Sequence, residues 1–148
     1  MTKIQNIISK TWQTALSVIK IALKSRPCNT PPRATDGDEI VVLGNGPSLN
    51  DTMAAHAEFL QKRDLLAVNF AANTPVFTTL KPKFYVLTDP VFFNRMELEN
   101  VQDLWNNFAN NVNWDMTLFI PTTAKHNSQW HSIIARNKHI SISTYNMT

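Results

Sequence analysis

The spacing of apolar residues changes near residue 38 and divides the chain into two parts. Over residues 1–25, apolar side chains recur at three- and four-residue intervals with lysines opposite them, which predicts an amphipathic helix. Residues 26–37 contain three prolines and predict a semi-extended linker. From residue 38 onward, short apolar runs rich in β-branched residues alternate with stretches of helical spacing.

The alternation over residues 38–148 predicts a Rossmann-like α/β fold, a mainly parallel sheet of about five strands with helices on both faces. The expected strands cover residues 39–43, 64–68, 83–87, 115–120 and 139–143. The expected helices cover residues 51–61, 73–80, 97–110 and 123–137, with Ser48 or Asn50 capping the first. In such sheets, ligands bind beyond the carboxyl ends of the strands, near the point where the strand order reverses.

Composition is that of one small domain. The chain has 148 residues, 43% of them apolar, so it can bury a hydrophobic core. Cys28 is its only cysteine, which excludes an internal disulfide framework and a cysteine-based zinc site. This cysteine usage fits a reducing compartment or indifference to redox conditions, and we expect a cytoplasmic protein.

Charge is divided between the same two parts of the chain. Residues 1–35 contain six of the fourteen lysines and arginines and no acid. Residues 36–148 contain the other eight basic residues and all eleven acids, so their net charge is −3. The basic character therefore belongs to the N-terminal arm. The body has no charge excess that would attract nucleic acid, so we expect no nucleic-acid partner.

Two interpretations of the arm stay open. A helix with lysines on one face and Ile, Leu and Trp on the other can lie in a membrane interface, which would make the protein peripheral on the inner membrane. It can equally dock on its own domain or on a second subunit of a homo-oligomer. It is too short to cross a membrane, because only nine residues between Lys10 and Lys20 are free of charge, against the ~20 that a crossing needs.

A glycine-containing loop follows the first expected strand. Two of the three glycines of the chain bracket Asn45 in the sequence Gly44-Asn45-Gly46-Pro47-Ser48. Glycine can adopt positive φ and lets a ligand approach the main chain, and a helix start presents N–H groups to an anion such as a nucleotide phosphate. The alternative interpretation is a tight strand-to-helix turn without a ligand.

Polar residues also follow the other expected strands. Asn69 follows the second, and its carboxamide can hydrogen-bond a base or ribose, or cap a local turn. Asp89 follows the third, after Thr88, and can hold a ribose hydroxyl or a metal ion, or cap the turn that begins at Pro90. Thr122 and Thr123 follow the fourth strand.

Three of these segments resemble a known family. Residues 42–49 (VLGNGPSL), 66–70 (LAVNF) and 84–90 (FYVLTDP) come in the order and at a spacing similar to the bacterial CMP-sialic-acid-dependent sialyltransferases that modify lipo-oligosaccharide and capsule. The similarity covers about residues 39–93. A very similar glycine string opens a domain related to the archaeal 6-hydroxymethylpterin diphosphokinases.

The resemblance implies a nucleotide site in which Gly44, Asn45, Gly46, Pro47 and Ser48 face the donor. It implies further contacts from Asn69 and from Asp89, which stands where the sialyltransferases carry asparagine. A carboxylate there repels the donor's phosphate unless a cation intervenes. We therefore also consider a Mg²⁺-dependent diphosphokinase-like enzyme, with Asp89 as a magnesium ligand; the transferase itself needs no cofactor.

The general base of such a transferase is not identifiable in this sequence. His56, His126, His131 and His139 lack metal-ligand spacing to one another, and we expect all four to be surface or half-buried residues. We expect no metal site. The family's second half would begin near residue 143, so we expect the domain to be truncated at its C-terminus.

The resulting hypothesis is a sialyltransferase-like glycosyltransferase of bacterial surface polysaccharide synthesis. It would bind a nucleotide-sugar, CMP-sugar favoured, and a saccharide or lipid-linked acceptor. The alternatives are the diphosphokinase-like enzyme and a non-catalytic half-domain that pairs with a partner chain.

Overall fold

A computed structural model describes residues 3–28, 39–44, 46 and 48–147. Asn45, Pro47 and most of the expected linker lie outside the described residues. The chain begins with helix α1 (Lys3–Lys24), and the domain follows with strands β1 (Ile40–Leu43), β2 (Asp64–Val68), β3 (Phe84–Val86), β4 (Met116–Pro121) and β5 (Ile140–Tyr145). The helices of the domain are α2 (Ser48–Gln61), α3 (Pro75–Leu80), α4 (Val91–Asn94), α5 (Glu99–Asn111) and α6 (Ser128–Ile134), with 3-10 turns η1 (Asn69–Asn73) and η2 (Thr122–Ala124).

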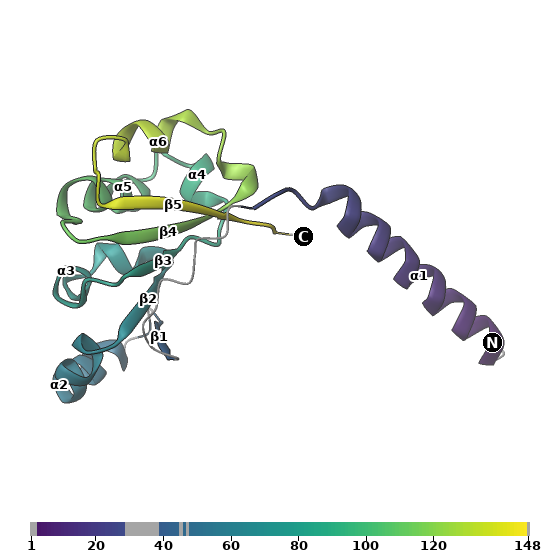
Figure 1. The fold of residues 1–148 in the computed structure, drawn as a ribbon, viewed down its shortest axis with the longest axis horizontal. Coiled ribbons are helices and arrows are strands. Elements are labelled where there is room, and N and C mark those ends of the chain that lie inside the picture. Colours follow the sequence, from purple (N-terminus) through teal and green to yellow (C-terminus); the bar gives the residue numbers. More distant parts are fainter. Residues whose placement is uncertain (1–2, 29–38, 45, 47, 148) are drawn as a thin grey trace.

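The five strands form one fully parallel sheet, which confirms the predicted α/β class (Figure 1). All five expected strands are present within two residues of their expected ends. Their order is β1-β2-β3-β4-β5, so each crossover moves one position in the same direction. The expected reversal of strand order is therefore absent. The site must be located by the strand ends alone.

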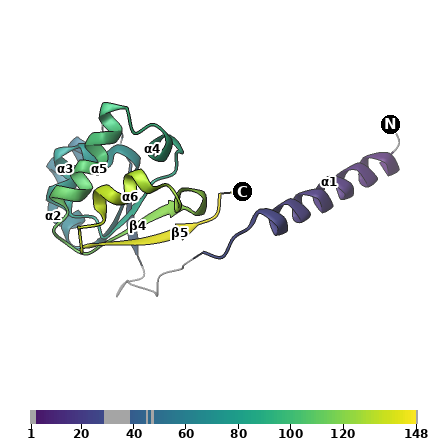
Figure 2. The same cartoon turned by 90° about the horizontal axis from the view of Figure 1, so that it is seen from above.

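The described helices of the domain pack on one face of this sheet, whereas the alternation of elements predicted helices on both. The strand register places Leu43, Ala67, Tyr85, Leu118 and Ile142 in one row across that face. Residues of α2, α3, α5 and α6 pack against this row and its neighbours. This one-sided cover follows from the sequential strand order, because successive right-handed crossovers return on the same side of a sheet. Figure 2 shows the same layering from above.

The larger hydrophobic cluster lies under β3, β4 and β5, and aromatic rings fill it. The indole rings of Trp105 and Trp130 stack with their centroids 5.2 Å apart, and both are almost fully buried. Phe108 contacts Trp105 edge-on at 5.6 Å and Tyr85 at 4.8 Å. Each buried indole N–H donates to a backbone carbonyl, of Phe92 and Ala124 respectively. Trp105 and Trp130 are therefore core residues.

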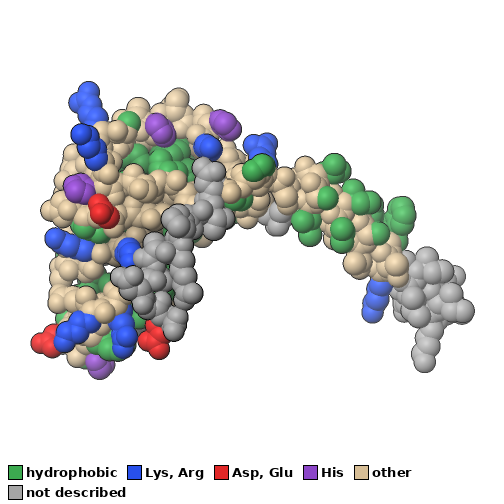
Figure 3. All heavy atoms as spheres, viewed as in Figure 1, with side chains coloured by type: hydrophobic (Ala, Val, Ile, Leu, Met, Phe, Trp, Pro, Cys, Tyr) green, Lys and Arg blue, Asp and Glu red, His purple; other side chains and the backbone are tan. Residues whose placement is uncertain are grey.

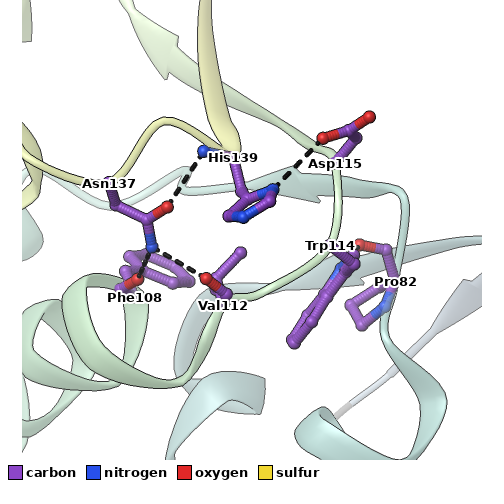
Figure 4. A network of polar contacts seen from close by, with 7 residues as sticks. All are labelled: Pro82, Phe108, Val112, Trp114, Asp115, Asn137 and His139. Atoms are coloured by element: carbon purple, nitrogen blue, oxygen red, sulfur yellow. Dashed lines mark hydrogen bonds and ion pairs between the residues drawn. The ribbon is translucent and has the colours of Figure 1, made fainter.

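At the amino end of the sheet, one asparagine joins α5 to β5 (Figure 4). The Nδ2 of Asn137 donates to the carbonyl oxygens of Phe108 and Val112, each at 2.9 Å, and its Oδ1 accepts from the backbone N–H of His139 at 3.0 Å. The carbonyls at the end of α5 thus gain donors that the helix cannot supply. The imidazole of His139 lies exposed, 3.3 Å from a carboxylate oxygen of Asp115.

Helix α1 stands apart from the domain in both ribbon views (Figures 1 and 2). Its side chains from Lys10 onward are exposed. The segment that follows it is fixed at the end of β5, where the backbone N–H and carbonyl of Arg26 bond Oδ1 and Nδ2 of Asn146 at 3.1 and 2.7 Å. No helix among the described residues is both long enough and apolar enough to cross a membrane.

Candidate functional site at the carboxyl ends of the strands

The carboxyl ends of β1, β2 and β3 lie side by side and bring the candidate residues to one edge. Leu43 pairs with Ala67, so Gly44 leaves β1 beside the end of β2. Val68 pairs with Val86, so Asn69 leaves β2 at the level at which β3 ends. Parallel pairing thus gathers residues that are far apart in sequence, as expected for a ligand edge of an α/β sheet.

Asn69 has the most distinctive geometry at this edge. Its φ is 51°, in the left-handed region that asparagine tolerates better than most residues. Its Oδ1 accepts hydrogen bonds from the Thr88 backbone N–H at 3.3 Å and from the Thr88 hydroxyl at 3.0 Å. The carboxamide therefore bridges β2 and β3, and it does not cap a local turn. A left-handed residue of this kind costs on the order of 1 kcal/mol, and such strain concentrates at functional sites.

Tyr85 supports Asn69 from the core. Its hydroxyl donates to the carbonyl oxygen of Asn69 at 2.5 Å and accepts from the backbone N–H of Ala72 at 2.8 Å. The ring is fully buried, and burial raises the pKa of the Tyr85 hydroxyl well above its usual value. The hydroxyl therefore stays protonated and holds the turn from β2 into η1 at two points.

The glycine loop differs in one respect from what the sequence suggested. Gly44 does not have a positive φ, so the left-handed freedom of glycine is not used at that position. A Cβ built on Gly44 would meet no atom within 4 Å, which leaves space beside the backbone. The amide of Leu49 donates to the carbonyl of Gly46, and α2 begins at Ser48, three residues earlier than expected. Ser48 is therefore the first residue of this helix.

Asp89 lies exposed beside Thr88 and caps a turn. Its Oδ1 accepts from the backbone N–H of Val91 at 2.9 Å, at the start of α4. This is the local capping role that the sequence offered as an alternative to ligand binding. Within residues 3–28, 39–44, 46 and 48–147, no three or more His, Cys, Asp or Glu residues group as metal ligands would.

The end of β5 contributes two residues, Tyr145 and Asn146, that the sequence reasoning did not single out. The Tyr145 hydroxyl donates to the carbonyl of Leu87 at 2.7 Å, which ties β5 to the end of β3, and partial burial raises the pKa of Tyr145. The Thr122 hydroxyl donates to Oδ1 of Asn146 at 3.2 Å. No sequence signal links Asn146 to Arg26, because 120 positions separate them.

The chemistry of this edge suits a ligand that accepts hydrogen bonds. Oδ1 of Asn69 is engaged by Thr88, so the carboxamide presents its Nδ2 donor to a ligand. Backbone N–H groups at the start of α2 lie beside the end of β1, where a helix start favours an anion. All four histidines are exposed, as expected, and His139 lies at the amino end of β5, away from this edge.

Comparisons with protein-family models, with curated proteins and with solved structures found no match to this chain.

Proposed function

We propose that this edge binds the nucleotide of a nucleotide-sugar, CMP-sugar favoured, in a glycosyltransferase-like protein of bacterial surface polysaccharide synthesis. The observation that carries the proposal is Asn69: a non-glycine residue in the left-handed region, held from two sides, at the strand end beside Gly44. Its free amide donor suits O2 or N3 of cytosine, or a ribose oxygen. The space beside Gly44 admits a phosphate close to the main chain.

In such a transfer, an acceptor hydroxyl attacks the anomeric carbon of the donor sugar, the glycosidic bond to the nucleotide breaks, and the nucleotide leaves with the bonding electrons. Binding of the nucleotide at this edge would orient the anomeric carbon toward a saccharide or lipid-linked acceptor. A base must remove the hydroxyl proton. The four histidines are not assigned that role, and the proposal covers donor binding only. A protein that uses nucleotide-sugars of this type is expected to act in the cytoplasm.

The direct test is the affinity of the full chain for CMP, measured by isothermal titration calorimetry. We expect CMP to bind, and we expect Asn69→Ala to weaken binding by about tenfold, the effect of losing one hydrogen bond to the ligand. Asn73→Ala is the control, because Asn73 is the other asparagine of η1, is exposed, and bonds the Asn100 carbonyl on the helix side. Equal affinity of Asn69→Ala and wild type would remove the site assignment.

The second candidate, a diphosphokinase-like enzyme, can be distinguished from the first by which nucleotide binds and by whether binding requires Mg²⁺. It requires ATP to bind only with Mg²⁺, with Asp89→Asn abolishing the effect of the ion. The CMP-sugar proposal requires CMP binding that is independent of Mg²⁺. Binding of ATP with Mg²⁺ and no response to CMP would favour the diphosphokinase.

A further inference from the structure

Helix α1 carries an apolar stripe that the described part of the domain does not cover. The stripe consists of side chains three or four residues apart, which therefore lie along one side of the helix. Their exposed fractions are large: Trp12 65%, Leu16 38%, Ile19 53% and Leu23 81%. Every side chain from Lys10 to Lys24 is exposed, and Figure 3 shows apolar side chains on the surface of this arm. An exposed apolar face of this kind marks a site of interaction.

Helix α5 shows how the domain treats a comparable face. Its apolar side chains also follow helical spacing, and all four are completely buried: Val101, Leu104, Trp105 and Phe108. Helices in proteins owe most of their stability to packing of the apolar face, so a helix of 22 residues that stands apart is marginal in water. The stripe on α1 therefore requires a cover that the described residues of the domain do not supply.

The charge of the arm indicates what kind of cover fits. Lys10, Lys20 and Lys24 are exposed on the part of α1 outside the stripe, Arg26 follows the helix, and residues 1–35 contain no acid. A helix that combines an apolar face with a lysine-rich polar face is typical of helices that lie in a membrane interface, where anionic lipids attract the basic side chains. Lysine stems can lie along apolar surface while their ammonium groups reach the lipid phosphates.

Trp12 supplies a second and independent indication. The other three tryptophans, Trp105, Trp114 and Trp130, each donate the indole N–H to a backbone carbonyl of the domain. The indole N–H of Trp12 has no partner among the described residues, and its ring is largely exposed. An indole has an apolar body and a polar N–H, so it suits the boundary between acyl chains and headgroups.

We propose that α1 lies on the surface of an anionic phospholipid membrane, with the apolar stripe in the boundary of the acyl chains and the lysines at the lipid phosphates. Its 22 residues extend about 33 Å along that surface. The helix lies on the membrane and does not cross it, in keeping with the absence of a helix among the described residues that could span one. The proposal is independent of the nucleotide site, and its test uses no nucleotide.

The attachment of α1 sets which part of the domain lies near the membrane. The amide of Ser25 donates to the Ile21 carbonyl, and the backbone N–H and carbonyl of the next residue, Arg26, both bond Asn146. Asn146 directly follows β5, so α1 leaves the domain at the carboxyl edge of the sheet and points away from it (Figure 1). A membrane-bound α1 therefore holds this edge of the sheet near the lipid surface.

The test is binding of the full chain to lipid vesicles, measured by co-sedimentation. We expect binding to vesicles of phosphatidylcholine and phosphatidylglycerol in equal amounts to be at least about tenfold tighter than to phosphatidylcholine alone, and to weaken as salt is raised. We expect Ile19→Asp to bind the anionic vesicles at least about tenfold more weakly than the matched control Ser17→Asp. Both substitutions add one negative charge at an exposed position, but Ser17 lies outside the stripe. Equal binding of the two variants would overturn the proposal.

Tryptophan fluorescence gives an independent readout of the same helix. Phospholipids with brominated acyl chains quench indoles that enter the boundary, and we expect quenching that Trp12→Phe abolishes, because Trp105 and Trp130 are buried in the domain. Quenching that persists in Trp12→Phe, or no binding to anionic vesicles at low salt, contradicts the proposal. A chain that ignores vesicles but self-associates, and becomes monomeric with Ile19→Asp, would assign the stripe to a second copy instead.

Discussion

The β3–β5 half of the domain and its β1–β2 half are built from the same alternation of strand and helix, but they are buried differently. The first rests on a continuous aromatic cluster that includes Trp105, Phe108 and Trp130. The second has a separate small cluster of four buried leucines: Leu43, Leu60, Leu65 and Leu80. The candidate site spans both halves, since Gly44 follows β1 in the β1–β2 half and Thr88 lies after β3 in the β3–β5 half.

This division has a consequence for function. The side of the site that contains Asn69, Thr88 and Tyr85 is held by the large core. On the other side, Leu43 of β1 and Leu49 of α2 belong to the small leucine cluster or pack against it, and α2 is interrupted at His56 by non-helical backbone. Binding elements of proteins are drawn from regions of lower local stability. We therefore expect β1 and α2 to adjust to a ligand and the Asn69 side to be preformed.

The largest effect is expected from truncation of the large cluster. Trp105→Ala should lower the free energy of unfolding by about 3–5 kcal/mol, because it removes a fully buried ring that contacts other rings and a buried hydrogen bond to Phe92. Urea denaturation measures the loss. Asn106→Ala, exposed on the same helix, is the control and should change stability by less than about 0.5 kcal/mol. A small loss for Trp105→Ala would contradict the ranking of the two halves.

A smaller and local effect is expected in the other half. Leu60→Ala should cost about 2–3 kcal/mol, since the exposed surroundings of α2 can collapse around the lost side chain. Hydrogen exchange should then speed up in β1 and α2 while β4 keeps its protection. Loss of protection in all strands together would show that the two halves unfold as one unit.

Tyr85→Phe links the core to the site. It should lower the free energy of unfolding by about 1–3 kcal/mol, because the buried Ala72 N–H and the Asn69 carbonyl both lose their partner.

The pH dependence of stability gives a second readout for Tyr85→Phe. The unfolded chain ionises Tyr85 near its usual pKa of about 10, while burial keeps the folded form neutral, so stability falls as the pH rises above that value. The phenylalanine variant should lack this share of the alkaline loss. Tyr145→Phe is the comparison for a hydroxyl that is only partly buried. An identical alkaline profile of Tyr85→Phe and wild type would contradict the assignment.

The local pattern of the sequence was sufficient for the strands and the core but not for their arrangement. The five apolar runs indicated the strands, and the aromatic positions at helical spacing indicated the helices. These elements can be predicted from the local sequence because they do not depend on which elements lie beside them. Strand order is a property of the whole chain, and nothing in a run such as residues 40–43 says which neighbour it will have. The alternation of strands and helices predicted cover on both faces of the sheet, whereas Val42 is 64% exposed.

The sequence predicted which residues follow the strands and form the candidate site, but not their backbone conformation or their hydrogen bonds. Asn69 was singled out because it follows a strand, but its left-handed backbone and its bond to Thr88 depend on β3 lying alongside. Asp89 was singled out by the same rule, and Pro90 next to it already predicted a turn; Asp89 caps that turn by accepting from the Val91 N–H. Asn146 was missed because its partner Arg26 is close only in the folded chain.

The most direct test of the account is backbone-amide NMR of the full chain during titration with CMP. The nucleotide-site proposal predicts that shift changes concentrate at the carboxyl ends of β1, β2 and β3, with Gly44, Gly46, Asn69 and Thr88 among the largest. It also predicts that amides at the amino end of the sheet, such as that of His139, do not respond. Saturable changes confined to the amino end, or no change at millimolar CMP, would contradict it.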